Sequence, residues 1–219
     1  MKRLTKRLAL AGQLAISILV FGSAQADVVI RAPEARAVFQ RDRAGEAEFE
    51  VRGLVEATAL ETLEIRAVRV DELAGEATEW EAVPNASIGV EFVHALRLVG
   101  GRYRIEARAR EGAGVTTETF VDKIGVGEVF ITAGQSNSAN SGRPALTPEE
   151  DRVSAWGPEG WQHARDPQPI ATGGGGTPWP VLGDLLVREQ GVPVGFISVG
   201  WGGTRVDQWL PGGTLYPRL

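Results

Sequence analysis

The stretch that decides the fold is VFITAGQSNSANSG, residues 129–142. A short, continuous apolar run ends near Gly134, and Ser136 follows two residues after that glycine. Continuous apolar runs are typical of strands that are covered on both faces, as in parallel sheets. Gly134 permits a tight turn, which would present Ser136 at the carboxyl edge of a sheet, where open α/β folds bind ligands. Two interpretations stay open at this point: a nucleophile, or an ordinary serine in a polar loop.

A second stretch of the same kind is VGFISVGWGGTRVDQWLP, residues 194–211. Again an apolar run ends in glycines, and Gly202 and Gly203 have no Cβ to keep a ligand away from their backbone N–H groups. A serine after one strand and bare amides after the next are the parts of an acyl-transfer site. A plain glycine-rich turn remains an alternative for Gly203.

A helix is predicted between these two strands. Thr177 suits the N-cap, Pro178 suits the first helical position, and Gly191 followed by Pro193 ends the helix. Its predicted apolar stripe consists of Val181, Leu182, Leu185 and Leu186. Strand, loop, helix and strand make one βαβ unit, so we expect an α/β domain with parallel strands over residues 124–219. Two such strands cannot bury both faces of a sheet, so we expect this domain to be incomplete.

The pattern before residue 124 has a period of two. In EAEFEVR, residues 46–52, Ala47, Phe49 and Val51 alternate with charged residues, and GRYRIEARAR, residues 101–110, repeats this alternation. Strict alternation indicates strands with one buried and one solvated face. Further strands are expected at 28–31, 37–40, 63–70, 78–82, 88–98 and 115–121. We therefore expect an all-β, immunoglobulin-like sandwich over residues 27–123.

Residues 1–26 have the three parts of a secretory signal peptide. Lys2, Arg3, Lys6 and Arg7 form a basic start, an apolar stretch follows, and Ala24-Gln25-Ala26 ends it. The apolar stretch is short for a membrane span, which needs roughly 20 residues, so we expect export to the periplasm or outside the cell and no stable membrane anchor. The chain has a formal net charge of −5, and without its basic leader it is more acidic still. Nucleic acid is therefore not an expected partner, and the absence of Cys excludes disulfides and thiolate metal sites.

The two glycine-ended strands together resemble the SGNH (GDSL-like) hydrolases. GQSN after the first strand and GWGGTRVDQW after the second are similar to the sialate O-acetylesterase-like carbohydrate esterases, as are WPVLGDLL and the preceding sandwich. The resemblance implies a flavodoxin-like SGNH domain, an acetylated carbohydrate substrate and a serine esterase mechanism. It makes Ser136 the nucleophile and Gly202 the oxyanion N–H donor, with Gly203 as the fallback. Gln135, Asn137 and Trp201 are then the expected substrate contacts.

The third block of that family and its late Asp-x-x-His have no counterpart before Leu219. The resemblance therefore implies a fragment that lacks the catalytic His and Asp, and we expect little or no esterase activity from it. The two histidines are weak substitutes. His94 is in phase with apolar neighbours and is expected in the sandwich core, whereas His163, with Asp166 near it, is expected at a loop or the substrate rim.

The remaining motifs give less specific predictions. Most tryptophans follow residue 150, where they could line a carbohydrate cleft or pack long loops on the core, and Trp201 is the one expected to meet substrate. The run TGGGGTP, residues 172–178, lacks the features of a phosphate loop and is expected to be a flexible loop. No cofactor and no metal site is expected. The alternative to an esterase is a secreted, non-catalytic β-sandwich that binds glycans or a partner, followed by a degenerate esterase remnant.

Overall fold

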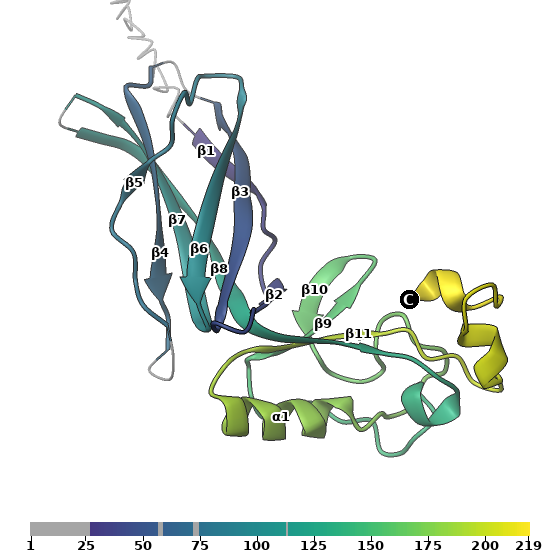
Figure 1. Ribbon diagram of the computed structural model, residues 1–219. Coiled ribbons are helices and arrows are strands. Elements are labelled where there is room, and N and C mark those ends of the chain that lie inside the picture. Colours follow the sequence, from purple (N-terminus) through teal and green to yellow (C-terminus); the bar gives the residue numbers. More distant parts are fainter. Residues whose placement is uncertain (1–26, 57–58, 72–74, 113) are drawn as a thin grey trace, which may run out of the picture.

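The computed structural model describes residues 27–56, 59–71, 75–112 and 114–219. The proposed signal peptide lies outside these residues. The described chain is rich in strands, contains one α-helix, and forms two sheets (Figure 1). The smaller sheet is antiparallel and has the order β1-β3-β6, and the larger has the order β10-β9-β11-β8-β7-β4-β5, with β2 paired to β8.

The strands of the smaller sheet are β1 (Asp27–Ala32), β3 (Glu46–Glu56) and β6 (Glu91–Val99). Those of the larger sheet are β2 (Val38–Gln40), β4 (Thr62–Arg69), β5 (Glu81–Ala82), β7 (Gly101–Glu111), β8 (Gly114–Thr132), β9 (Val153–Gly157), β10 (Gly160–His163) and β11 (Val194–Ser198). The helices are η1 (Ser136–Ser138), α1 (Trp179–Gln190), η2 (Val206–Trp209) and η3 (Tyr216–Arg218).

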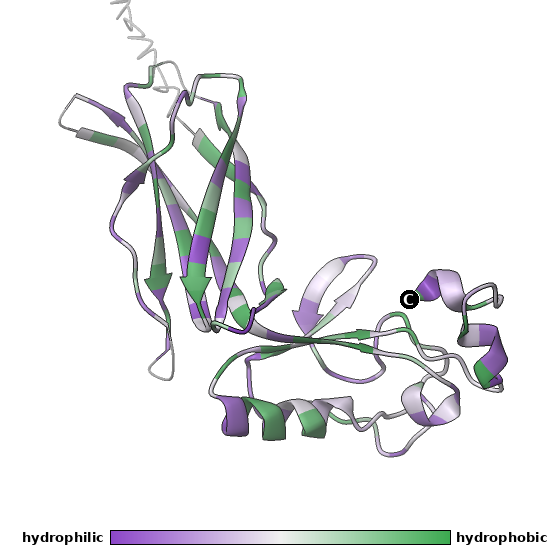
Figure 2. Cartoon of the chain, viewed as in Figure 1, coloured by the Kyte–Doolittle hydropathy of each residue, from purple (hydrophilic) through white to green (hydrophobic). Residues whose placement is uncertain are grey.

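The N-terminal sandwich is built as the period-two pattern predicts. Phe49 and Val51 of β3 are buried while the glutamates between them face solvent, and the alternating bands are visible along β3 in Figure 2. Ile105 and Ala107 of β7 are buried in the same way. Side chains from both sheets meet in one apolar core, so the two sheets face each other across it.

Strand β8 belongs to both regions of the molecule. Up to Val126 it pairs antiparallel with β7, and from Glu128 to Thr132 it pairs in parallel with β11. The boundary expected at residues 123–124 falls inside this strand, which passes from the sandwich into the C-terminal region without interruption (Figure 1). The segment expected to be buried on both faces is exposed at Phe130 and Ile131, because beyond Gly127 β8 has no strand neighbour on its other side among the described residues.

Helix α1 packs on the C-terminal part of the sheet through a different face from the predicted one. Of the predicted stripe, Val181, Leu182 and Leu185 are exposed and Leu186 packs against the core. The buried residues of the packing face include Gly183 and Val187. A Cβ on Gly183 would lie 2.4 Å from Val153 Cγ1, so the glycine lets the helix backbone approach the sheet. The helix begins at Trp179, one residue after the expected start, although Thr177 Oγ1 still accepts a hydrogen bond from the Trp179 N–H at 3.3 Å.

The segment expected to be a long loop before α1 contains the antiparallel hairpin of β9 and β10. Strand β9 also pairs in parallel with β11, so it extends the sheet by one neighbour. Trp161 of β10 packs against the core of the sandwich, and its N–H donates to Glu34 Oε1 at 3.2 Å. The hairpin therefore links the two regions rather than forming part of a free loop.

Candidate functional site

The two strands that precede the predicted site residues are neighbours in the sheet. β8 and β11 run parallel, with Ile131 opposite Ile197 and Thr132 opposite Ser198, so their carboxyl ends lie together. The Thr132 hydroxyl donates to Ser198 Oγ at 3.0 Å between these ends. The loops that carry Ser136 and Gly202 consequently leave the same edge of the sheet, as the sequence predicts.

The chain turns sharply after β8 and enters the single turn of η1. Gly134 has a φ of 130°, a conformation that side-chain-bearing residues rarely adopt. The turn is closed by Ser138, whose N–H and hydroxyl both bond to the Gln135 carbonyl oxygen at 2.9 Å. Ser138 is buried, whereas Ser136 is partly exposed and its hydroxyl donates to Gln135 Oε1 at 3.1 Å.

The loop after β11 lies directly against this turn. The Trp201 N–H donates to the Gly134 carbonyl oxygen at 2.8 Å, and a Cβ on Gly200 would lie 2.4 Å from the Ser138 carbonyl oxygen. The Gly202 N–H donates to Thr172 Oγ1 at 2.8 Å, so the expected oxyanion donor already has an acceptor. The Gly203 N–H has no acceptor among the described residues, which makes the fallback position the less encumbered amide.

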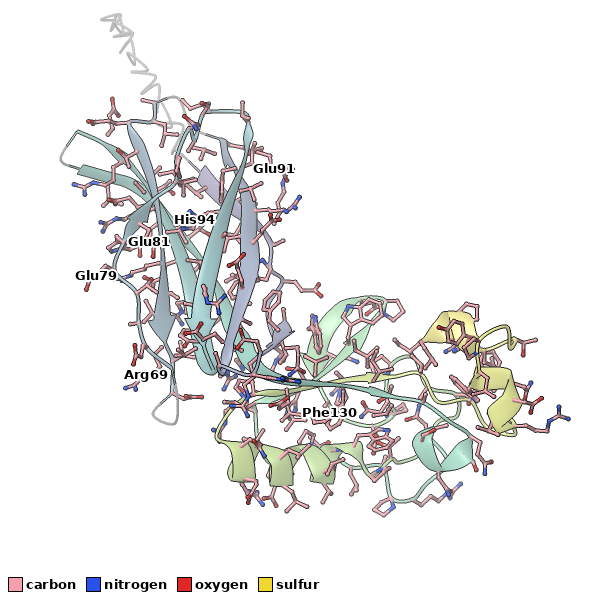
Figure 3. All side chains as sticks on the ribbon, viewed as in Figure 1. Arg69, Glu79, Glu81, Glu91, His94 and Phe130 are labelled. Carbon is pink, nitrogen blue, oxygen red and sulfur yellow. The ribbon has the colours of Figure 1, made fainter. Side chains whose placement is uncertain are left out.

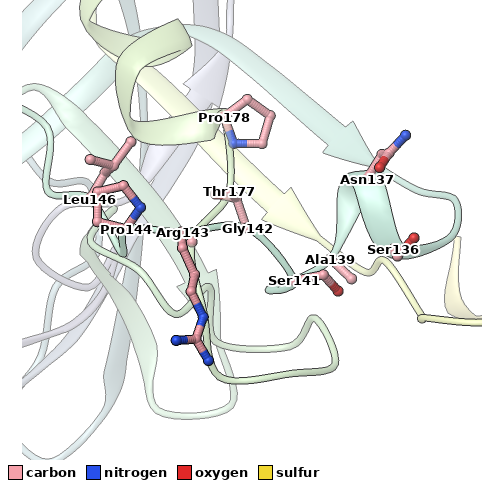
Figure 4. Close-up of a pocket in the computed structure, with 11 residues that line it drawn as sticks. Ser136, Asn137, Ala139, Ser141, Gly142, Arg143, Pro144, Leu146, Thr177 and Pro178 are labelled. Atoms are coloured by element: carbon pink, nitrogen blue, oxygen red, sulfur yellow. The ribbon is translucent and has the colours of Figure 1, made fainter.

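Ser136 lines a cavity of about 430 Å³ (Figure 4). Ser136 and Asn137 form one side of it, and Arg143, Pro144 and Leu146 form the opposite side. The other expected contacts lie elsewhere. Gln135 lines a separate, mainly apolar cavity with Trp209, and Trp201 and Gly202 line neither of these two cavities.

Neither histidine of the sequence is placed to activate Ser136. His163 ends β10, and its Nε2 lies 3.2 Å from the Glu150 carbonyl oxygen. His94 lies on β6 in the sandwich with its Nε2 3.4 Å from Glu81 Oε2 (Figure 3), close to the core position expected for it. Among the described residues the Ser136 hydroxyl bonds to Gln135 alone, so in this part of the chain the serine has no imidazole base beside it.

Asp166 does not orient His163. Its carboxylate accepts hydrogen bonds from the Leu146 and Thr177 N–H groups at 3.1 and 2.8 Å, and from the Thr177 hydroxyl at 2.7 Å. Gln168 Nε2 also donates to it at 3.1 Å. The aspartate therefore ties the two loops that border the Ser136 cavity to each other, a role that its sequence position beside His163 did not reveal.

The glycine run at residues 173–176 is an ordered wall of the site, not the flexible loop that its composition predicts. Gly142 and Gly176 exchange two backbone hydrogen bonds of 2.8 and 2.7 Å, and the Gly175 N–H donates to the Asn140 carbonyl oxygen at 2.8 Å. A Cβ on Gly175 would lie 2.4 Å from the Gly142 carbonyl oxygen. Glycine is needed here because the two backbones are in contact.

Some tryptophans pack on the core, and one is exposed where it could line a carbohydrate cleft. Trp179 packs on the core of the C-terminal region, and Trp209 is buried with its Nε1 donating to Thr204 Oγ1 at 3.0 Å. Trp201 is exposed, and the Arg218 guanidinium lies 4.8 Å from the centroid of its ring. Trp201 is thus the tryptophan beside the glycine loop that remains open to solvent, and its contact with substrate stays a prediction.

Two further properties concern the described residues as a set. None of their His, Asp and Glu side chains form a group of three or more that could hold a metal ion. Within the same part of the chain, no helix has the length and apolar character that a membrane crossing requires.

The site is a pocket at one edge of the sheet, with a partly exposed serine after one parallel strand and a glycine loop after its neighbour. Residues 126–219 match the family model described as carbohydrate esterase, sialic acid-specific acetylesterase. This match confirms the resemblance to the sialate O-acetylesterase-like carbohydrate esterases that the two motifs indicate.

Two solved structures are also similar to the chain. A carbohydrate acetylesterase from Xanthomonas citri is 21% identical, with a TM-score of 0.39, over 84% of this chain and 43% of that one. A protein from Arabidopsis thaliana is 19% identical, with a TM-score of 0.34, over 42% of this chain and 47% of that one. The chain spans less than half of the length of either structure, and TM-scores this low establish no shared fold. A comparison with curated proteins finds no match.

Proposed function

We propose that the chain is an exported carbohydrate O-acetylesterase in which Ser136 is the nucleophile. We further propose that residues 124–219 are part of a flavodoxin-like SGNH hydrolase domain and that residues 27–123 are an immunoglobulin-like sandwich. The observation that carries the proposal is the position of Ser136: it is the hydroxyl at the carboxyl edge of β8 that faces a cavity, within the region that matches an acetylesterase family. The signal-peptide pattern of residues 1–26 supports export.

The proposed reaction is an acyl transfer in two steps. Ser136 Oγ attacks the acetyl carbonyl carbon while a base accepts the hydroxyl proton. The sugar oxygen then leaves with a proton, and an acetyl-serine ester remains. Water attacks this ester, which releases acetate and restores the hydroxyl. Backbone N–H groups of Ser136 and of the glycine loop would hold the oxyanion, with Gly203 favoured over Gly202 because the Gly202 N–H already bonds to Thr172.

The missing element is the base. Because His163 bonds to a backbone carbonyl and His94 lies in the sandwich, neither is in position to accept the Ser136 proton. Losing one member of a catalytic triad lowers the rate by several orders of magnitude and leaves a slow residual hydrolysis, here by attack of the Ser136 hydroxyl without help from a base. We therefore expect only this residual hydrolysis from the chain by itself.

The test is hydrolysis of an activated acetyl ester and of an acetylated sugar by the purified chain. Ser136→Ala should reduce the residual rate to that of buffer. Ser141→Ala is the matched control, since Ser141 lines the same cavity and should change the rate less than about two-fold. Equal rates for the chain and Ser136→Ala would contradict the nucleophile. A rate typical of complete esterases, abolished by both Ser136→Ala and His163→Ala, would contradict the missing base.

A second candidate function, glycan binding without catalysis, is favoured by the lack of a base beside Ser136. In the part of the chain that the structure describes, no imidazole lies beside Ser136, which is compatible with a protein that binds glycans in this cavity without hydrolysing them. Binding of acetylated sugars with rates equal to buffer for both the chain and Ser136→Ala would favour this candidate.

A further inference from the structure

A second cavity next to Ser136 has no role in the acyl-transfer scheme. It has a volume of about 320 Å³ and is mainly apolar. Its lining comes from two segments that are distant along the chain: residues 133–135 in the turn after β8, and residues 204–206 with Trp209 after the glycine loop. It shares no lining residue with the cavity that Ser136 itself lines.

This second cavity lies between the proposed nucleophile and the proposed oxyanion donor. One wall contains Gln135, and the Ser136 hydroxyl donates to Gln135 Oε1 at 3.1 Å, so the hydroxyl is directed toward that wall. The other wall begins at Thr204, directly after Gly203, whose N–H has no acceptor among the described residues. In a tetrahedral intermediate the acyl carbon is bonded to the nucleophile while its oxygen bonds to the amide donors. We therefore expect the rest of the acyl group to extend between these two walls.

The two cavities beside the nucleophile differ in their chemistry. The cavity that Ser136 lines includes Asn137 and Arg143, which suit the hydroxyl groups of a sugar. Among the described residues, Arg205 is the one charged residue in the lining of the second cavity, and it bonds to both carboxylate oxygens of Asp207, at 2.9 and 2.6 Å. An alkyl chain gains free energy on leaving water for an apolar cavity, whereas a sugar would lose hydrogen bonds there. The second cavity therefore suits the acyl chain and not the sugar.

Hydrogen bonds connect the walls of the second cavity. Trp209 is buried, and its Nε1–H donates to Thr204 Oγ1 at 3.0 Å. The same hydroxyl donates to the Trp201 carbonyl oxygen at 2.8 Å, and the Trp201 N–H donates to the Gly134 carbonyl oxygen at 2.8 Å. The cavity is thus already formed before a ligand arrives, which reduces the cost of binding.

We propose that this cavity is an acyl pocket that accepts chains longer than acetyl, and that Val206 and Trp209 determine the preferred length. A methyl group is about the size of a water molecule, which takes roughly 30 Å³, so an acetyl group leaves most of the cavity empty. Val206 is 76% exposed, and an acyl chain in the pocket would cover it. The substrate class then includes propionyl and butyryl esters of sugars. This inference rests on the proposed function for the position of the attacked carbonyl, but binding of the acyl chain does not require turnover.

The first experiment compares hydrolysis of 4-nitrophenyl acetate, propionate and butyrate by the purified protein. The quantity compared is the Ser136-dependent rate, which is the rate of the parent minus that of Ser136→Ala, divided by the rate of the same ester in buffer. Burying one further methylene group strengthens binding by roughly four-fold, so butyrate should be preferred to acetate by about ten-fold. A Ser136-dependent rate that is equal for the three esters, or that falls with chain length, would overturn the proposal.

A matched pair of variants tests the position of the acyl chain. Val206→Asp places a carboxylate of similar size in the lining, and should lower the butyrate-to-acetate preference by at least about three-fold because the charge must stay hydrated. Val181→Asp is the control, since Val181 is also exposed but lies on α1 and lines neither cavity. It should leave the preference within about two-fold of the parent. Equal preferences in the two variants would overturn the assignment of Val206.

A binding measurement in the Ser136→Ala background separates the pocket from the chemistry. The probes are ethyl acetate and ethyl butyrate, which this variant does not consume. Ethyl butyrate should shift the indole N–H signal of Trp209 in two-dimensional NMR spectra, with an affinity about ten-fold higher than that of ethyl acetate. The indole signal of Trp80, whose ring packs on Arg108 of the sandwich, is the internal control and should not move. Equal affinities of the two probes, or an unmoved Trp209 signal at millimolar ethyl butyrate, would overturn the pocket.

The two proposals fail separately in these assays. Preferential binding of ethyl butyrate beside Trp209 without Ser136-dependent hydrolysis would leave the apolar pocket standing and reject the esterase function. Ser136-dependent hydrolysis without a preference for butyrate would do the reverse.

Discussion

The sandwich and the C-terminal region differ in how their cores are made. In the sandwich, two sheets enclose one long apolar core, and alternate residues of β3, β4 and β7 point into it. In the C-terminal region a much smaller core lies between helix α1 and strands β9 and β11, and close backbone contacts of glycines contribute to the packing. The alternation of apolar and polar side chains can be recognised in the sequence, but close contacts between distant backbone segments cannot. The two regions therefore differ both in robustness and in how well they can be predicted.

The largest loss of stability is expected from a substitution in the sandwich core. Ile105→Ala removes a fully buried side chain at the centre of β7, and should destabilise the protein by about 2–5 kcal/mol through lost burial and the cavity left behind. Urea unfolding followed by far-ultraviolet circular dichroism measures the change. Val115→Ala, at an exposed position on β8, should cost less than about 0.5 kcal/mol. Equal losses for both variants would contradict a core organised by alternation.

The long strands β3, β4 and β7 of the sandwich could be predicted from sequence, because each of them alternates buried and solvated residues with a period of two. The C-terminal region was predicted in outline only. The parallel pairing of β8 with β11 followed from their apolar runs, and it is confirmed. The predicted face of α1 was wrong except at Leu186, which packs against the core. The helix buries Gly183 and Asp184, and a hydropathy pattern does not identify those two as packing residues. Asp184 is buried because its carboxylate accepts the Glu149 and Glu150 N–H groups at 3.0 and 2.9 Å.

A substitution on α1 tests that corrected face directly. In an exposed helix Gly→Ala is stabilising by about 1 kcal/mol, but Gly183→Ala would place its Cβ 2.4 Å from Val153 Cγ1. Overpacking of this kind costs about 1–3 kcal/mol, so we expect a net destabilisation of about 1–2 kcal/mol. Leu185→Ala, on the exposed stripe, is the control and should cost less than about 0.5 kcal/mol. A stabilised Gly183→Ala together with a strongly destabilised Leu185→Ala would restore the face predicted from sequence.

In the candidate site, too, local sequence patterns predict strand ends and turns but not contacts between distant segments. Ser136 and the glycine loop could be located from sequence, because strand ends and glycines are local signals. Thr172 and Asp166 could not, since their importance comes from contacts between segments that are distant along the chain. The prediction of a flexible loop at residues 173–176 was wrong for this reason. The composition of this segment is that of a flexible loop, but its backbone hydrogen bonds with Gly142 hold it in place.

The smallest expected effect concerns the ion cluster that joins the two regions. Arg36, Arg102 and Lys123 of the sandwich all bond to Asp151, the residue that leads towards β9, with Lys123 Nζ at 2.8 Å. Burial raises the pKa of Asp151, but these three cations outweigh it and hold the pKa well below its usual range. A lowered folded-state pKa contributes stability above the unfolded value of about 3.9, and this contribution is lost as the pH falls further. Because the carboxylate is partly exposed, Asp151→Asn should cost about 0.5–1 kcal/mol at pH 7 and less at pH 3.

Because most tryptophans follow residue 150, their fluorescence reports chiefly on the C-terminal region, whereas circular dichroism is dominated by the strands of the sandwich. If Asp151 couples the two regions, their unfolding transitions in urea should coincide in the parent chain and separate in Asp151→Asn at pH 7. Glu159→Gln, which removes a charge from the tip of the neighbouring hairpin, should leave them coincident. Coincident transitions in Asp151→Asn, with the parent stability at pH 7, would mean that β8 and the Trp161 contact hold the regions together without the ion cluster.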